Sequence, residues 1–253
     1  VVLIIFFATP VTTMLFPAFS KLAFHKDKEL LRNIFQYSVK YAALVVVPVT
    51  ALVIALAQPA IGTIFEDKYA QAPLFLALLS VTYLYSALGN LSAGNLINGQ
   101  GYTRFNLKLT VLTVAIGFPL SFVLISQFGV IGLIVTSLTV GLPSLFISLR
   151  FIKKRFGVSV EWVSSAKILF SSAVAVIITY VLISQLSFSS PIQLAVGVVV
   201  FVLIFLLAAL LTRTVNRADV SNLREIINAL GPLRKPLNAL LNLIEKLMII
   251  LQP

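Results

Sequence analysis

A few polar residues inside apolar runs are the candidates for chemistry in this sequence. Lys40 precedes an uncharged run, and its ammonium could either meet a phosphate in a wet cavity or reach the membrane surface through its long stem. The run at 72–98 places polar side chains at helical spacing on one face, namely Tyr83, Ser86, Asn90 and Asn98. Such a face could offer hydrogen bonds to a polar ligand or hold neighbouring helices together. Both interpretations stay open at this point.

Residues for bond-making chemistry are scarce. The chain has no cysteine and one histidine, His25, which lies in a charged loop. Thiol chemistry and Cys-based zinc sites are therefore excluded. All eight carboxylates lie in breaks between apolar runs, at the ends of runs or in the C-terminal tail, so we expect no proton or sodium relay in mid-membrane. We expect no catalytic residue, no metal and no cofactor, and hence no enzyme.

The composition indicates the class of protein. The 253 residues are 59% hydrophobic and 11% charged, with a mean hydropathy of +1.05, whereas soluble proteins are about 25% charged. The net charge of +11 would suggest a nucleic-acid partner in a soluble protein, but the sequence has no basic face with interleaved aromatic residues. We expect an all-α polytopic membrane protein that binds no nucleic acid.

Apolar runs separated by short polar breaks predict seven transmembrane helices. The uncharged run from Tyr41 to Phe65 has 25 residues, more than the roughly 20 that a helix needs to cross about 30 Å of hydrocarbon. The expected spans are roughly 1–20, 36–64, 72–98, 106–126, 129–149, 165–186 and 192–212. They would form one bundle at 1–213, followed by a tail at 214–253.

Prolines inside these spans are predicted to bend them. Proline removes a backbone donor and clashes with the preceding turn. Lipid cannot satisfy the freed carbonyl, so neighbouring helices must support each bend. The predicted hinge positions are Pro10, Pro17, Pro48, Pro119 and Pro143.

Basic residues alternate between the breaks. They crowd the first, third and fifth breaks and the end of the last span, and of 19 Lys and Arg only Lys68 falls in an even-numbered break. The positive-inside rule places the basic breaks and the C-terminus in the cytoplasm. The sequence opens at Val1 inside an apolar run, which predicts that preceding helices belong to the same protein.

The tail changes character after Arg217. Between 233 and 251, leucine and isoleucine recur at spacings of four and three, with polar residues opposite, a pattern typical of an amphipathic helix. We expect this helix to lie on the cytoplasmic leaflet with its cations near anionic headgroups. The alternative is that it packs against the bundle or a partner.

The order of several motifs resembles the polysaccharide-exporter branch of the multidrug/oligosaccharidyl-lipid/polysaccharide (MOP) superfamily, which includes Wzx-type flippases. The motifs are LFPAFSKL at 15–22, YSVKYAALVVVP at 37–48, LAQPAIGTIFEDKYAQA at 56–72, GNLINGQG at 94–101 and QFGVIGLIVTS at 127–137. The sequence departs from the pattern at Glu66, where the family usually has glycine.

The resemblance implies a MATE-like protein of fourteen helices in two halves, with this chain holding helices 8 to 14. It also implies a flippase of the cell membrane that moves a lipid-linked oligosaccharide or polysaccharide precursor by alternating access. Lys40 would then meet the diphosphate of the substrate, and Tyr83, Ser86, Asn90 and Asn98 would line the same cavity. The alternatives are a drug or cation antiporter, disfavoured by the lack of membrane acids, and a membrane-embedded glycosyl or acyl transferase.

Overall fold

The chain is an all-α polytopic membrane protein. The computed structural model describes residues 2–22 and 27–215 and scattered positions between 219 and 245. Over these residues the regular structure consists of α-helices and short 3-10 helices, without a strand. Five helices are long and apolar enough to cross a bilayer, and one bent pair supplies a sixth candidate span.

The helices follow the order of the expected spans. They are α1 (Val2–Ser20), α2 (Lys28–Ala55), α3 (Ala57–Phe65), η1 (Glu66–Lys68), α4 (Ala72–Ser80), η2 (Val81–Leu88), α5 (Asn90–Gly99), α6 (Thr103–Phe128), α7 (Val130–Phe156), α8 (Trp162–Ser184) and α9 (Ser190–Leu211). The five long apolar helices are α2, α6, α7, α8 and α9. The first expected span coincides with α1, which is not among these five helices. Its role as a membrane span stays a prediction.

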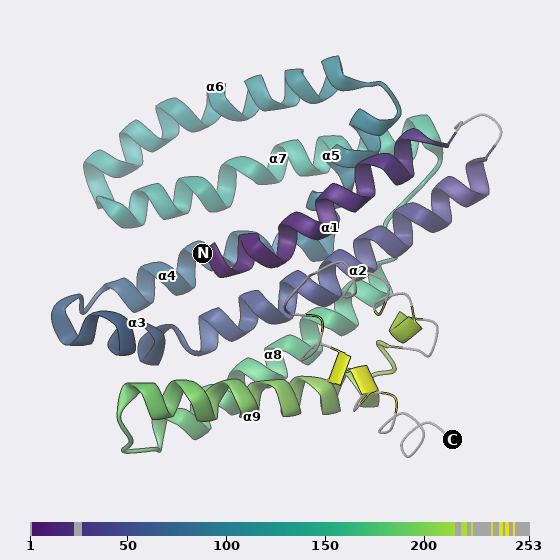
Figure 1. The fold of residues 1–253 in the computed structure, drawn as a ribbon. Coiled ribbons are helices and arrows are strands. Elements are labelled where there is room, and N and C mark those ends of the chain that lie inside the picture. The colour runs from purple at the N-terminus through teal and green to yellow at the C-terminus, as the bar shows by residue number, and fades with distance from the viewer. Residues whose placement is uncertain are drawn as a thin grey trace.

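Helix α2 lies at the centre of the bundle. Figure 1 shows the α6–α7 hairpin on one side and the α8–α9 hairpin on the other, with α1 and α2 between them. Helix α2 contacts α1, α4, α5, η2, α8 and α9. Of its most apolar 18 residues 61% are buried, against 6% in α6. The core is therefore built on α2, whereas α6 exposes most of its surface.

Small side chains bring α8 close to its neighbours. Ser171, Ser172, Ala175 and Thr179 are all at most 2% exposed, and Ala175 lies in one apolar cluster with alanines of α2. Helices in lipid associate mainly through van der Waals packing, so small residues stabilise the bundle by letting backbones approach.

The predicted hinge prolines all lie inside continuous helices. Pro10 and Pro17 lie in α1, Pro48 in α2, Pro119 in α6 and Pro143 in α7. Their role as hinges stays a prediction. The helix break in the second span occurs instead at Leu56, between α2 and α3. Pro59 explains this position, because a proline ring clashes with the carbonyl four residues earlier, at Ala55.

The third expected span is a broken helix. Its two parts, 72–88 and 90–99, are bent by 52° at Gly89, whose φ of 88° is left-handed. Glycine adopts this conformation without the steric cost of a Cβ, and side chains of Val39 and Val160 already lie 3.3 Å from where a Cβ would be. The expectation of one continuous helical face from Tyr83 to Asn98 is therefore wrong.

The predicted tail helix at 233–251 lies mostly outside the described residues. Among the positions that are described, Leu241 is 3% exposed. It belongs to the apolar cluster that contains Tyr41 and Leu206. At this position the tail contacts the bundle.

Glu66 ends α3 in an unusual backbone conformation. Its φ is 54° and its ψ is −146°, a region that non-glycine residues avoid because of their Cβ. This is the position at which the sequence departs from the glycine of the family pattern. The turn after α3 therefore stores backbone strain in Glu66.

Replacing Glu66 by glycine should raise the free energy of unfolding by about 1 kcal/mol. Strain of this kind costs on the order of 1–3 kcal/mol, and the greater flexibility of glycine in the unfolded chain offsets part of the gain. Thermal unfolding of the purified protein in detergent measures the change. Lys68→Gly, in the same turn but at ordinary φ, should lower stability, and a Glu66→Gly variant that is no more stable than the parent would contradict the strain.

Candidate functional site

A buried ion pair joins α2 to the segment after α9. The Lys40 Nζ lies 2.6 Å from the Asp219 Oδ2, and the two side chains are 10% and 1% exposed. Lys40 stands twelve residues into α2, about 18 Å along the axis at 1.5 Å per residue. The Lys40 ammonium therefore does not extend to the membrane surface. It is bound by a carboxylate inside the protein.

The surroundings of this pair are apolar. Val215 and Val220, on the Asp219 side, lie in one buried cluster with Tyr41 and Ala43 of α2. Water is largely absent from such a site, so the attraction between the charges is stronger than at the surface. For the same reason, leaving either charge alone would be costly.

The other predicted site residues occupy different surroundings. Tyr83 packs against the cluster of Ile4, Ala8 and Val46. The hydroxyl of Ser86 is buried and donates to the Tyr83 carbonyl oxygen at 2.8 Å, while Asn90 is exposed and Asn98 half-buried.

The structure does not join these residues to Lys40. Within the described part of the chain, the one hydrogen bond of the Lys40 ammonium goes to Asp219, and Gly89 turns Asn90 and Asn98 away from the helix of Tyr83 and Ser86. Their shared role in lining a cavity stays a prediction.

Side-chain hydrogen bonds join helix ends that are distant in the sequence. Gln100 Nε2 donates to the carbonyls of Phe19 and Leu22 at 2.6 and 3.0 Å, which joins the end of α5 to the end of α1. Arg155 Nε donates to the Tyr102 hydroxyl at 2.7 Å. These bonds stabilise the arrangement of α1, α5 and α7 at one end of the bundle.

The first part of the chain is similar in sequence to a known protein family. A family described as polysaccharide biosynthesis protein matches residues 2–74. This segment is similar to polysaccharide biosynthesis proteins. No curated protein and no solved structure matches the chain. The similarity covers less than a third of the residues and, together with the long apolar helices, supports a multi-pass membrane protein of polysaccharide biosynthesis or export.

The matched segment contains the central helix and one half of the ion pair. It runs through α1, α2 and α3 into the start of α4, and so includes Lys40, whereas Asp219 lies far outside it. Among the described residues no group of three or more His, Cys, Asp or Glu could hold a metal ion. Of the two ion pairs that the structure describes, the Lys40–Asp219 pair is the buried one.

Asp219→Asn should lower the free energy of unfolding by about 3–5 kcal/mol, because it leaves the Lys40 charge buried without its carboxylate. The double replacement Lys40→Met with Asp219→Leu should recover most of that loss, since an apolar pair needs no desolvation of charge. Thermal or denaturant unfolding in detergent measures both changes.

A matched control is the exposed pair of Arg224 and Glu245, which is 3.0 Å long with side chains 37% and 48% exposed. Arg224→Gln should cost at most about 1 kcal/mol, as surface pairs do. If Asp219→Asn cost no more than Arg224→Gln, the buried pair would not stabilise the bundle.

Proposed function

We propose that this chain forms the C-terminal half of a flippase that moves a lipid-linked oligosaccharide or polysaccharide precursor across the cell membrane. The observation that carries the proposal is the match of residues 2–74 to polysaccharide biosynthesis proteins within a polytopic bundle. A glycan precursor on a lipid has a polar head that cannot cross hydrocarbon unaided. Transport of this polar head, and not bond chemistry, is therefore the task that we propose for the chain.

The order of the motifs supports the finer assignment to the MOP superfamily, with these helices as numbers 8 to 14 of a MATE-like fold. The broken spans support it as well. Transporters build their substrate sites around discontinuous helices, and α2–α3 and η2–α5 are broken at Leu56 and Gly89. In this proposal the partners are the lipid-linked glycan, anionic lipids at the tail, and the N-terminal half of the same protein.

Lys40 is the proposed counter-charge of the substrate diphosphate. Phosphate oxygens form strong charge-assisted hydrogen bonds with ammonium groups, and Asp219 holds the Lys40 charge at 2.6 Å. During alternating access the phosphate would replace this carboxylate. Tyr83, Ser86, Asn90 and Asn98 would then offer hydrogen bonds to the glycan from the broken span.

Lys40→Ala in the full-length protein should reduce translocation about tenfold or more, because a hydrogen bond to a charged group contributes about 1.5–3 kcal/mol. Lys40→Arg should retain part of the activity. The measurement is transfer of a lipid-linked oligosaccharide across proteoliposomes, normalised to inserted protein.

The double variant Lys40→Met with Asp219→Leu distinguishes a role of the Lys40 charge in transport from its role in stability. It should be folded and yet inactive, while Lys108→Ala, which removes an exposed cation of α6, should transport normally. A folded double variant with full activity would assign the pair to stability alone and refute its role in transport.

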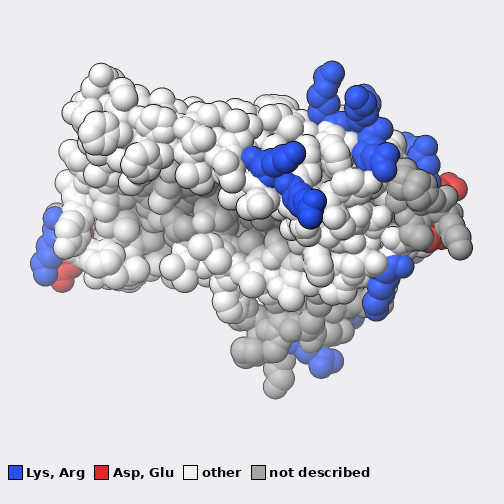
Figure 2. Space-filling model, turned by 90° about the horizontal axis from the view of Figure 1, so that it is seen from above, with Lys and Arg blue, Asp and Glu red and all other residues white. Residues whose placement is uncertain are grey.

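The charge distribution leads to a topological proposal. Figure 1 places the α1–α2, α5–α6 and α7–α8 connections at one end of the bundle and the α3–α4, α6–α7 and α8–α9 connections at the other. Figure 2 shows Lys and Arg gathered mainly towards one end. By the positive-inside rule this basic end is cytoplasmic.

Single cysteines test this topology in a chain that has none of its own. Ser187→Cys, in the α8–α9 connection, should react with an impermeant maleimide only from outside the cell. Lys154→Cys, at the end of α7, should react only from the cytoplasmic side. The reverse pattern would overturn the proposed orientation.

A further inference from the structure

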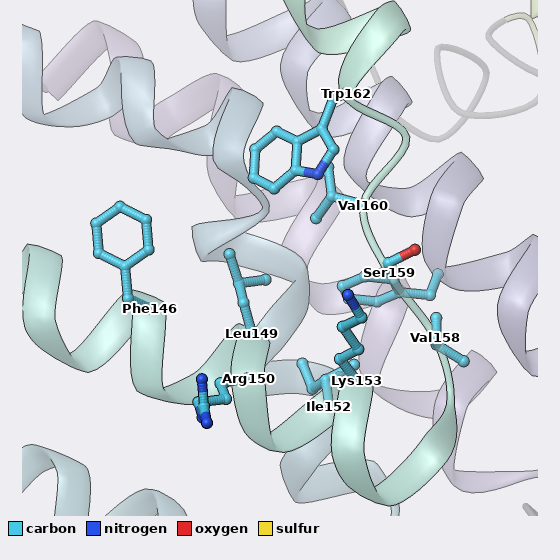
Figure 3. Close-up of a pocket in the computed structure, with 10 residues that line it drawn as sticks. Phe146, Leu149, Arg150, Ile152, Lys153, Val158, Ser159, Val160 and Trp162 are labelled. Atoms are coloured by element: carbon cyan, nitrogen blue, oxygen red, sulfur yellow. The ribbon is translucent and has the colours of Figure 1, made fainter.

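A pocket of about 400 Å³ lies where α7 ends and α8 begins. Its base is apolar and comes from Phe35 of α2, Ile152 of α7 and the connecting residues Val158 and Val160. Figure 3 shows the connecting segment passing beside the last turns of α7, with Trp162 at the start of α8 above Leu149. The pocket is thus formed by α2 together with a segment far from it in the sequence, which runs from the last turns of α7 to the start of α8.

The wall made by the connecting segment is held in place. Helix α7 stops at Gly157, whose φ of 69° is left-handed. Val158 and Val160 are then 1% and 5% exposed and alternate with exposed Ser159 and Glu161, the period of an extended chain. Gln36 Nε2 donates to the Ser159 carbonyl at 3.2 Å, so the wall is bound to α2 as well as anchored in the core.

Two cations of α7 line this pocket and have no ion-pair partner among the residues that the structure describes. Arg150 and Lys153 are three residues apart, a spacing that makes side chains neighbours on a helix, and both are exposed. Within the described residues the ion pairs are those of Lys40 and Arg224, so Glu161, the nearest carboxylate in sequence, neutralises neither cation. In Figure 3 the Lys153 side chain extends toward Ser159. The pocket therefore offers positive charge beside an apolar base.

Aromatic residues place the pocket at a membrane surface. Trp162, the single tryptophan of the chain, is 52% exposed, and Phe146, one turn before Arg150, is 58% exposed. Tryptophan is enriched where hydrocarbon meets headgroups. An exposed phenylalanine on an apolar helix faces acyl chains, whereas the cations one and two turns later reach the headgroups.

We propose that this pocket binds the headgroup of an anionic phospholipid, with Arg150 and Lys153 on the phosphate and Trp162 and Phe146 against the glycerol and upper acyl chains. Basic pockets between transmembrane helices bind acidic lipid headgroups, and charge-assisted hydrogen bonds to phosphate are among the strong ones. The apolar base and the two exposed aromatic side chains favour a lipid over free phosphate, which would leave them without a partner. The site is separate from the Lys40–Asp219 pair and does not depend on the transport proposal.

The single tryptophan makes the site measurable without an added label. The full chain is reconstituted in phosphatidylcholine vesicles that contain increasing amounts of brominated phosphatidylglycerol, and quenching of Trp162 fluorescence gives the association constant of that lipid at the pocket. Brominated phosphatidylcholine gives the reference value. We expect phosphatidylglycerol to bind about thirtyfold more tightly than phosphatidylcholine, because each of the two cations near the surface contributes about 1 kcal/mol and about 1.4 kcal/mol is tenfold.

Two double variants decide between this pocket and general surface charge. Arg150→Gln with Lys153→Gln should abolish the preference for phosphatidylglycerol. Arg104→Gln with Lys154→Gln removes the same charge from exposed positions at the same end that do not line the pocket, and should keep the preference. Equal loss in both double variants, or no preference in the parent protein, would overturn the proposal.

A soluble competitor separates lipid from free phosphate. Glycerol 3-phosphate added to the vesicles at millimolar concentration should leave the quenching by brominated phosphatidylglycerol unchanged. Full recovery of Trp162 fluorescence would show that the pocket binds a free phosphate ester, contrary to the proposal.

Discussion

The burial of α2 is the constraint on which the rest of the structure depends. This helix is surrounded by α1, α4, α5, η2, α8 and α9, so polar atoms along it cannot rely on water. Lys40 accordingly has an internal carboxylate at 2.6 Å, and the Thr50 hydroxyl donates to the Val46 carbonyl at 2.7 Å. A buried polar group costs free energy unless it is paired, and the central helix meets this requirement over its described length.

Two kinds of cation follow from this arrangement. Lys40 is buried and bound by Asp219, whereas Arg150 and Lys153 are exposed beside an apolar pocket. The buried cation is held by the fold, and an arriving phosphate would have to compete with a carboxylate for it. The exposed pair has no such competitor within the described residues. Burial therefore decides whether a basic side chain in this bundle is bound by the protein or is accessible to a ligand.

Backbone geometry decides where the spans break. Pro48 lies within continuous α2, while the break follows Ala55, four residues before Pro59. Gly89 bends the third span by 52° with a left-handed φ. A proline in a span therefore does not break the helix by itself, since Pro119 lies within continuous α6, which is mostly exposed, whereas a left-handed glycine breaks the third span.

The amino-acid sequence by itself determined the class of protein, the order of its apolar helices and the basic character of alternate breaks, because hydrophobic length and charge are local properties. It also marked Glu66 as unusual, and the strained φ of 54° gives the reason. Only the tertiary structure decided that Lys40 is bound by Asp219, 179 residues away, and that Phe35 of α2 shares one pocket with Arg150, Lys153 and Trp162. No periodicity encodes such contacts, since they arise when helices that are distant in sequence pack together.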